Sequence, residues 1–129
     1  MKEDRAQQLL ALRPELTLER TAVNPAEQFQ NDTLRPILKF QNDLLLALYQ
    51  QYLRKRKAKF STLSEQAKRD YIAHSVQKDR SLRQLLLGVI IGHFSIEEWE
   101  RYQLLESELS RRIGSLLIQR LRDQLDFFA

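Results

Sequence analysis

The last quarter of the chain carries apolar residues at the spacing of an α-helix. Ser95 and Glu98, in the sequence "SIEE", form a capping-box pattern, in which each side chain bonds to a free backbone amide at the start of a helix. From Trp99 onward an apolar residue follows every three or four positions as far as Phe128. This spacing places the apolar side chains on one side of a helix, so the sequence predicts one long helix from Ser95 to Phe128.

A second long helix is expected nearer the start of the chain. The sequence "NPAE" at 24–27 offers Asn24 as N-cap and places a proline at the first helical position. Apolar residues then recur at helical spacing as far as Tyr52, and the helix should run to about Lys57. Pro36 lies inside this pattern and has no backbone N–H to donate, so we expect a kink or a break there.

Two shorter helices are expected between these long ones. Ser61 or Ser64 can cap a helix that runs to about Lys78, and Asp79 stands where a further helix would begin. The segment 82–94 is apolar almost all round. A helix of that kind is usually buried on every side, so we expect it in the centre of the fold.

These patterns define the expected fold class. The chain has only 3 glycines and 3 prolines, too few for the many turns of an all-β protein. We therefore expect an all-α fold: a small antiparallel helical bundle of four main helices, with a kinked first long helix and an N-terminal arm. Residues 1–23 would form the arm, with a short helix from about Glu3 to Leu12, and residues 24–129 would form the bundle domain.

The arm carries a cluster of leucines that needs a surface to cover. That surface is either the protein's own bundle or a partner, and the sequence leaves both open. The leucines concerned are Leu9, Leu10, Leu12, Leu16 and Leu18.

The longest run of charge is basic. The stretch "RKRKAK" at 54–59 has five cations in six positions, and no acidic residue occurs between Leu44 and Ser64. Three interpretations stay open: a solvated helix end whose cations face the negative end of the helix dipole, a contact with RNA or other phosphates, and docking on an acidic protein. The residues concerned are Arg54, Lys55, Arg56, Lys57 and Lys59.

An acidic stretch and the aromatic C-terminus are further candidate contacts. Five glutamates stand against one arginine between Glu97 and Ser110, and Glu97 and Glu98 lead this stretch. The acidic and basic stretches can attract each other within the fold or in a dimer. Phe127 and Phe128 either close the base of the bundle or insert into a partner.

The sequence shows no catalytic constellation. It has no cysteine, so disulfides and thiolate metal sites are excluded, and it has no glycine-rich phosphate loop and no Glu-x-x-His motif. Asp70 and His74 lie one helical turn apart, and His93 lies near Glu97 or Glu98, which are weak metal-binding patterns. We therefore expect a protein that is not an enzyme and that uses no metal and no small-molecule cofactor.

The apolar runs are too short for a membrane span. The longest, from Leu85 to Ile91, is about a third of the roughly 20 residues that cross a bilayer. No secretory signal is recognisable at the N-terminus, and the lack of cysteine is typical of a reducing compartment. We expect a cytoplasmic protein without a membrane partner.

Four stretches of the chain occur together in a known pattern: "QLLALRPEL", "FQNDTLRPILKFQNDLLL", "VQKDRSLRQLLLGVIIGHFSIEEW" and "RRIGSLLIQRLRDQLDFF". They resemble a small bacterial family of all-helical proteins over nearly the whole chain. Members of that family often carry the label "glyoxalase", which implies a lactoylglutathione lyase. Glyoxalases are βαβββ metalloenzymes with His and Glu ligands on strands, and this sequence predicts neither, so the resemblance implies a helical fold and carries over no activity.

The function expected from the sequence is protein interaction in the bacterial cytosol. The chain would serve as an adaptor or as the subunit of a complex, with another protein or a second copy as partner. The alternative is an RNA- or ribosome-associated protein that contacts phosphates through residues 54–59, and a glyoxalase-like lyase is the third, disfavoured hypothesis.

Overall fold

The computed structural model describes residues 2–16 and 24–128, and every regular element in these ranges is a helix or a helical turn. The expected all-α fold is confirmed for this part of the chain. In the list that follows, η1 is a π-helical turn, and η2 and η3 are 3-10 turns. The elements are α1 (Lys2–Leu12), α2 (Pro25–Phe29), η1 (Gln30–Leu34), α3 (Arg35–Phe40), α4 (Asn42–Lys55), η2 (Phe60–Thr62), α5 (Glu65–Lys78), α6 (Arg80–Ile91), α7 (Ile96–Leu104), α8 (Glu106–Arg122) and η3 (Leu125–Phe128).

The helix starts agree with the capping residues read from the sequence. In each case a side-chain oxygen of the cap accepts a hydrogen bond from the backbone N–H three residues on, which satisfies one of the free amides of the first turn. The box at the start of α7 is complete, because Glu98 also accepts from the backbone N–H of Ser95 at 2.9 Å. The capping residues are Asn24, Ser64, Asp79 and Ser95.

The kink or break expected at Pro36 takes the form of two irregularities, one before and one after the proline. The π-helical turn η1 directly precedes the proline's helix, and the N–H of Arg35 donates to the carbonyl of Gln30, five residues back. Pro36 then sits in the first turn of α3, where a missing N–H costs little. The helix itself breaks at Gln41, whose ψ of 7° is not helical, and α4 begins at the next residue.

The prediction of a single helix from Ser95 to Phe128 is wrong, because the chain breaks at Leu105. That residue has φ −126° and ψ 29°, and it separates α7 from α8. Glu106 and Glu108 fall in the first turn of α8, where carboxylates face the positive end of the new helix dipole. The spacing of apolar residues continues across the break, which is why the sequence pattern did not reveal it.

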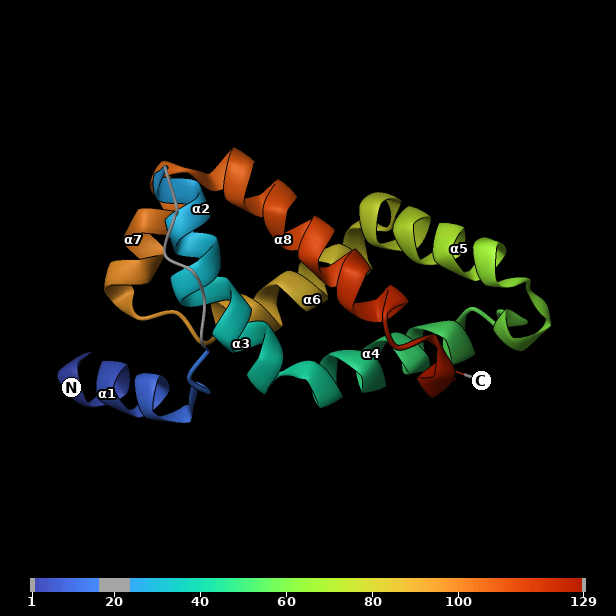
Figure 1. The fold of residues 1–129 in the computed structure, drawn as a ribbon, viewed down its shortest axis with the longest axis horizontal. Coiled ribbons are helices and arrows are strands. Elements are labelled where there is room, and N and C mark those ends of the chain that lie inside the picture. Colours follow the sequence, from blue (N-terminus) through green and yellow to red (C-terminus); the bar gives the residue numbers. More distant parts are fainter. Residues whose placement is uncertain (1, 17–23, 129) are drawn as a thin grey trace.

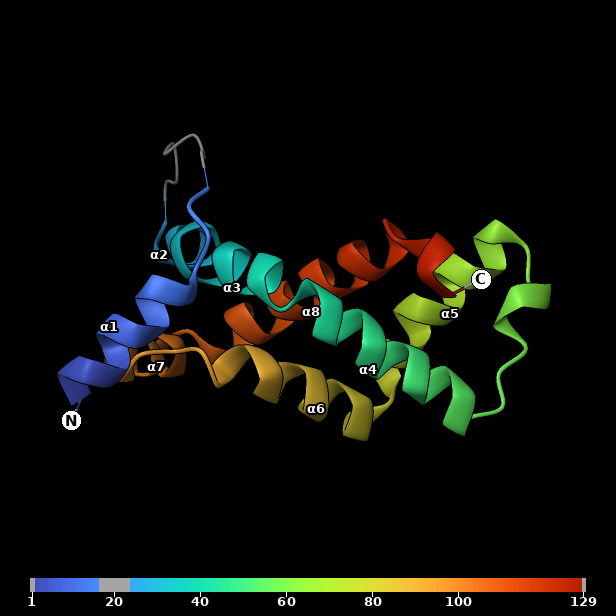
Figure 2. The ribbon, with the colours of Figure 1, turned by 90° about the horizontal axis from the view of Figure 1, so that it is seen from below.

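The helices form an elongated molecule with its core along α8. The α1, α2 and α7 helices gather at one end, and the connection from α4 to α5 lies at the other (Figures 1 and 2). The α8 helix packs against α5, and α6 packs against both α4 and α5. The most deeply buried side chains come from α3, α4, α5, α6 and α8, and they include Ile37, Leu45, Tyr49, Ile72, Leu86, Ile90, Leu109, Ile113 and Leu117.

The expectation that the helix after Asp79 lies in the centre of the fold is wrong. One side of α6 is buried through Leu82, Leu86 and Ile90, but Leu85 on its other side is 50% exposed. The apolar surface of α6 is therefore divided between the core and the solvent.

The end of α4 explains part of the basic stretch. The N–H of Lys57 donates to the carbonyl of Arg54 at 3.0 Å, and the N–H of Ala58 donates to the carbonyl of Leu53 at 3.0 Å. These two bonds form a Schellman cap, which needs a left-handed residue at the position of Lys57. Lys57 has φ 51°, a conformation in which a side chain is strained and glycine is not.

Replacing Lys57 by glycine should stabilise the protein. We expect Lys57→Gly to raise the free energy of unfolding by about 0.5–1 kcal/mol in urea denaturation, because the strain at this position is relieved. Gln51→Gly, on the exposed middle of α4, is the control and should lower the free energy of unfolding by about 1 kcal/mol. Equal destabilisation by both substitutions would contradict the cap.

Candidate functional site

A buried ion pair holds the N-terminal arm on the rest of the protein. Arg13 follows α1 directly, and its guanidinium donates to both carboxylate oxygens of Glu98, each at 2.7 Å. The two side chains are only 6% and 8% exposed. Arg13 Nη2 also donates to the backbone carbonyl of His93. A bidentate pair of this kind fixes the direction of both side chains.

Glu98 is bonded from two further directions. It accepts from the hydroxyl of Thr33 in η1 at 2.9 Å and from the N–H of Ser95, in addition to Arg13. Burial by itself raises the pKa of Glu98, but the bonds from Arg13, Ser95 and Thr33 outweigh burial and hold the pKa below its ordinary value. The prediction that Glu98 is a partner contact is therefore wrong, because the arm occupies it, whereas Glu97 is exposed.

The arm packs in cis at this junction. Arg5 on α1 adds bonds to the backbone carbonyls of Phe94 at 2.6 Å and Gly92 at 3.2 Å. The question that the sequence left open is thus decided for the described part of the arm. Among the leucines predicted as contacts, Leu9 and Leu16 are half-buried, Leu10 and Leu12 are exposed, and Leu18 lies outside the described residues.

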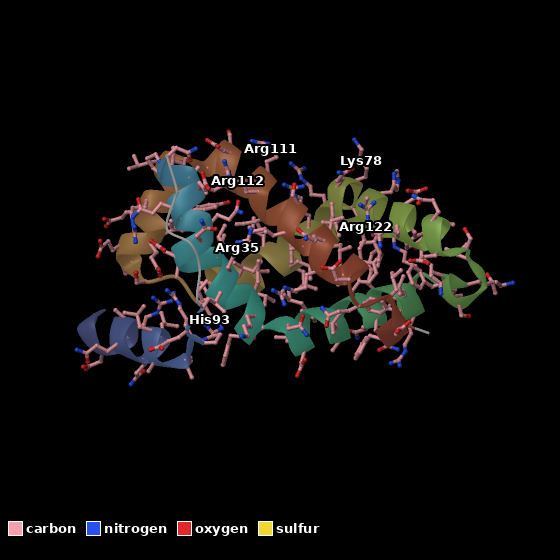
Figure 3. The ribbon with its side chains drawn as sticks, viewed as in Figure 1. Arg35, Lys78, His93, Arg111, Arg112 and Arg122 are labelled. Atoms are coloured by element: carbon pink, nitrogen blue, oxygen red, sulfur yellow. The ribbon has the colours of Figure 1, made fainter. Side chains whose placement is uncertain are left out.

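His93 lies between the arm and α3 (Figure 3). Its Nε2 is 2.9 Å from the Gln41 amide nitrogen, and its ring contacts that of Phe40 at 5.3 Å between centroids. The other ring nitrogen, Nδ1, is buried and has no hydrogen-bond partner within residues 2–16 and 24–128. Burial lowers the pKa of His93, and the positive charges of Arg13 and Arg5 lower it further.

The basic stretch at 54–59 is exposed, and part of it has a structural role. All five cations lie at the surface, as expected for a contact site. Arg56, however, is paired with Asp79, the N-cap of α6, and its guanidinium stacks 5.3 Å from the ring centroid of Tyr52. Lys57 holds the capping position, and the carbonyl of Lys59 accepts from the hydroxyl and the N–H of Thr62. Within residues 2–16 and 24–128, the side chains of this stretch without a bonded partner are those of Arg54, Lys55, Lys57 and Lys59. Phosphate binding by this stretch remains a prediction.

The two C-terminal phenylalanines have different environments. Phe128 is buried, and its ring contacts those of Tyr49 at 5.4 Å and Phe60 at 5.9 Å between centroids. Phe127 is exposed. Phe128 therefore closes the base of the core, and only Phe127 remains available for the partner contact that the sequence predicted.

The α4 and α6 helices lie side by side (Figure 2), and both carry exposed apolar side chains on the surface of the pair. Gln41 meets His93 at one end of the pair, and Tyr52 donates to Asp79 at 2.9 Å at the other. We call this surface the α4–α6 face. Its exposed members are Phe40 at the end of α3, Leu44 on α4 and Leu85 on α6, with exposed fractions of 43%, 46% and 50%, and Gly88 on α6 is exposed as well.

The titratable side chains that the structure describes do not form a metal-binding group. Within residues 2–16 and 24–128, no three side chains of His, Asp or Glu come together as metal ligands would. Asp70 accepts from the Gln66 amide at 2.9 Å, and His74 one turn later is exposed. None of the helices in the described ranges has both the length and the apolar composition that a membrane crossing requires.

No protein-family model, curated protein or solved structure matches this chain. The resemblance to a bacterial helical family thus stays a prediction from the sequence.

The environment of His93 predicts a pH-dependent stability. The folded state disfavours the protonated ring, because the ring is partly buried and its positive charge would stand beside Arg13 and Arg5. In the neutral ring Nε2 accepts from the Gln41 amide N–H, and a proton on Nε2 would remove that bond. Unfolding restores an ordinary pKa of about 6.5. The unfolded chain therefore binds more protons below that value, and the free energy of unfolding should fall as the pH drops from 7.5 through 6.5 to 5.5.

Denaturation at these pH values tests whether His93 causes the pH dependence of the free energy of unfolding. The substitution His93→Gln should flatten the dependence, whereas His74→Gln, at an exposed histidine, should leave it in place. A wild-type stability that is constant or rises between pH 7.5 and 5.5 would show that His93 accepts a proton in the folded protein as easily as in the unfolded one.

Proposed function

We propose that this chain is a non-catalytic protein-interaction subunit of the bacterial cytosol, built as a small antiparallel helical bundle, that pairs with a second copy of itself through the α4–α6 face. The observation that carries the proposal is the exposure of Phe40, Leu44 and Leu85 at the neighbouring helices α4 and α6, whose residues 44–53 and 84–92 carry no charge. Exposed apolar side chains that gather in one place, instead of being scattered singly, mark interaction sites.

The lack of charge on this face sets it apart from the rest of the chain. Residues 44–53 and 84–92 contain no charged side chain, although 29% of all residues are charged. Arg83, just before the second of these ranges, donates to the carbonyl of Ser110 at 3.1 Å and so turns toward α8. The centres of protein interfaces are likewise depleted in charge.

The glycines of α6 allow a close approach. A Cβ added at Gly88 would meet no atom of the described residues within 4 Å, and Gly92, the residue that follows α6, lies one turn later. A glycine inside a helix costs about 1 kcal/mol relative to alanine. At Gly88 no contact within the chain offsets this cost, whereas the backbone of a partner helix could use the space.

A second copy is the partner that the charges favour. A two-fold contact places the same patch on both sides of the interface. Since the protein carries a net charge of +4, most of its surfaces would repel their own copy. Residues 44–53 and 84–92 of the α4–α6 face contribute no charge that would repel a second copy, and they offer an oppositely charged partner nothing to attract.

Sedimentation equilibrium tests this pairing. We expect the wild-type chain of 15.3 kDa to associate to twice that mass at micromolar concentration, and Gly88→Glu to remain at 15.3 kDa. The substitution fills open space on this chain and replaces glycine by a better helix former, so the monomer should keep its stability.

The control is Gln77→Glu, which adds the same charge at an exposed position of α5 and should leave the pairing intact. Thermal unfolding of both variants confirms that each is folded. A wild-type protein that stays at 15.3 kDa up to several hundred micromolar, or a Gly88→Glu variant that pairs as the wild type does, would overturn the proposal.

A further inference from the structure

A groove of about 590 Å³ lies between the end of α3, the start of α4 and the last two turns of α8. It shares no residue with the basic stretch at 54–59. Three cations line it, Arg35 and Lys39 from α3 and Arg120 from α8. Figure 3 labels Arg35 on α3, on the side where α8 passes. The volume lies within the range of small-molecule sites, roughly 300–1,000 Å³.

The Arg120 guanidinium is held in place by amides. Its Nη1 donates to Asn42 Oδ1 at 3.0 Å, and Gln124 Nε2 donates to the same oxygen at 2.8 Å. Asn42 Nδ2 in turn donates to Gln124 Oε1 at 3.0 Å. A side chain positioned by such bonds loses little conformational freedom when it binds a ligand.

The cations of the groove have no direct carboxylate partner. Arg35 donates to the side chain of Asn31 at 3.1 Å, and in the ranges that the structure describes none of Arg35, Lys39 and Arg120 forms a salt bridge. Burial lowers the pKa of Arg120. The charge of Asp123 raises this pKa, and the charge of Arg35 lowers it. Arg35 and Arg120 therefore line the same groove near enough for their charges to interact, and Asp123 offsets part of the charge of Arg120.

We propose that this groove binds a phosphate group between Arg35 and Arg120, with Lys39 at its rim. Arginine presents paired N–H donors that match the oxygens of a phosphate, and a dianion would balance the two guanidinium charges. Asp43 and Asp123 also line the groove and reduce its net charge to +1, so the phosphate is held by direct bonds from the two arginines and not by the net charge of the groove. The remaining volume accommodates the group that carries the phosphate.

Two sources of phosphate share this chemistry, a free phosphate compound and the backbone of a single-stranded RNA. Isothermal titration calorimetry with inorganic pyrophosphate, at low and at moderate salt, tests the site itself. We expect one pyrophosphate per chain, with an affinity that falls as salt rises. A short RNA that pyrophosphate displaces would assign the backbone as the source, and an RNA that does not bind would assign a free compound.

The substitution Arg120→Gln removes the charge and should weaken pyrophosphate binding about tenfold or more. Arg35→Gln should do the same, whereas Arg35→Lys, which keeps the charge, should retain part of the affinity. The matched control is Arg111→Gln, which removes the same charge near the other end of α8 (Figure 3) and should change the affinity less than about twofold.

Circular dichroism of each variant confirms that the fold is intact. The site would be overturned by a wild-type protein that binds no pyrophosphate at low salt, or by equal losses in Arg120→Gln and Arg111→Gln. Either result is independent of the pairing through the α4–α6 face, which sedimentation measures in the absence of any ligand.

Discussion

The buried pair of Arg13 and Glu98 joins parts of the chain that no local structure connects. The two residues lie 85 positions apart, and the carboxylate binds the arm, the π-helical turn through Thr33 and the start of α7 through Ser95. Removing one partner of such a pair leaves a buried charge and costs roughly 3–5 kcal/mol. The position of α1 at its end of the molecule therefore depends on this contact more than on the leucines of the arm, two of which remain exposed.

The junction also determines which surfaces remain free. With the arm docked, Arg5 and Arg13 cover the backbone around His93, and Glu98 is withdrawn from the acidic stretch. Besides the exposed cations of residues 54–59, the described chain still presents the apolar α4–α6 face and the groove beside α8. The face and the groove differ in chemistry, so one favours another apolar surface and the other a small anion.

Local sequence signals predicted the helices and their starts, but not the contacts between distant segments. Asn24, Ser64, Asp79 and Ser95 act on amides three residues away, so their roles are readable from spacing alone. The partner of Arg13 could not be found in this way, because nothing near "LRP" points to a glutamate at the start of a distant helix. For the same reason the groove was missed, since its cations on α3 and α8 converge only in the folded chain.

Amide hydrogen exchange in α1, followed by mass spectrometry, tests the docked arm most directly. In Glu98→Gln the charge is lost while the capping box can still form, and Glu97→Gln changes an exposed neighbour in the same way. We predict that residues 5–12 are protected in the wild type and in Glu97→Gln and exchange at least about tenfold faster in Glu98→Gln. An α1 helix that exchanges like an unstructured peptide in the wild type, or that keeps its protection in Glu98→Gln, would contradict the account.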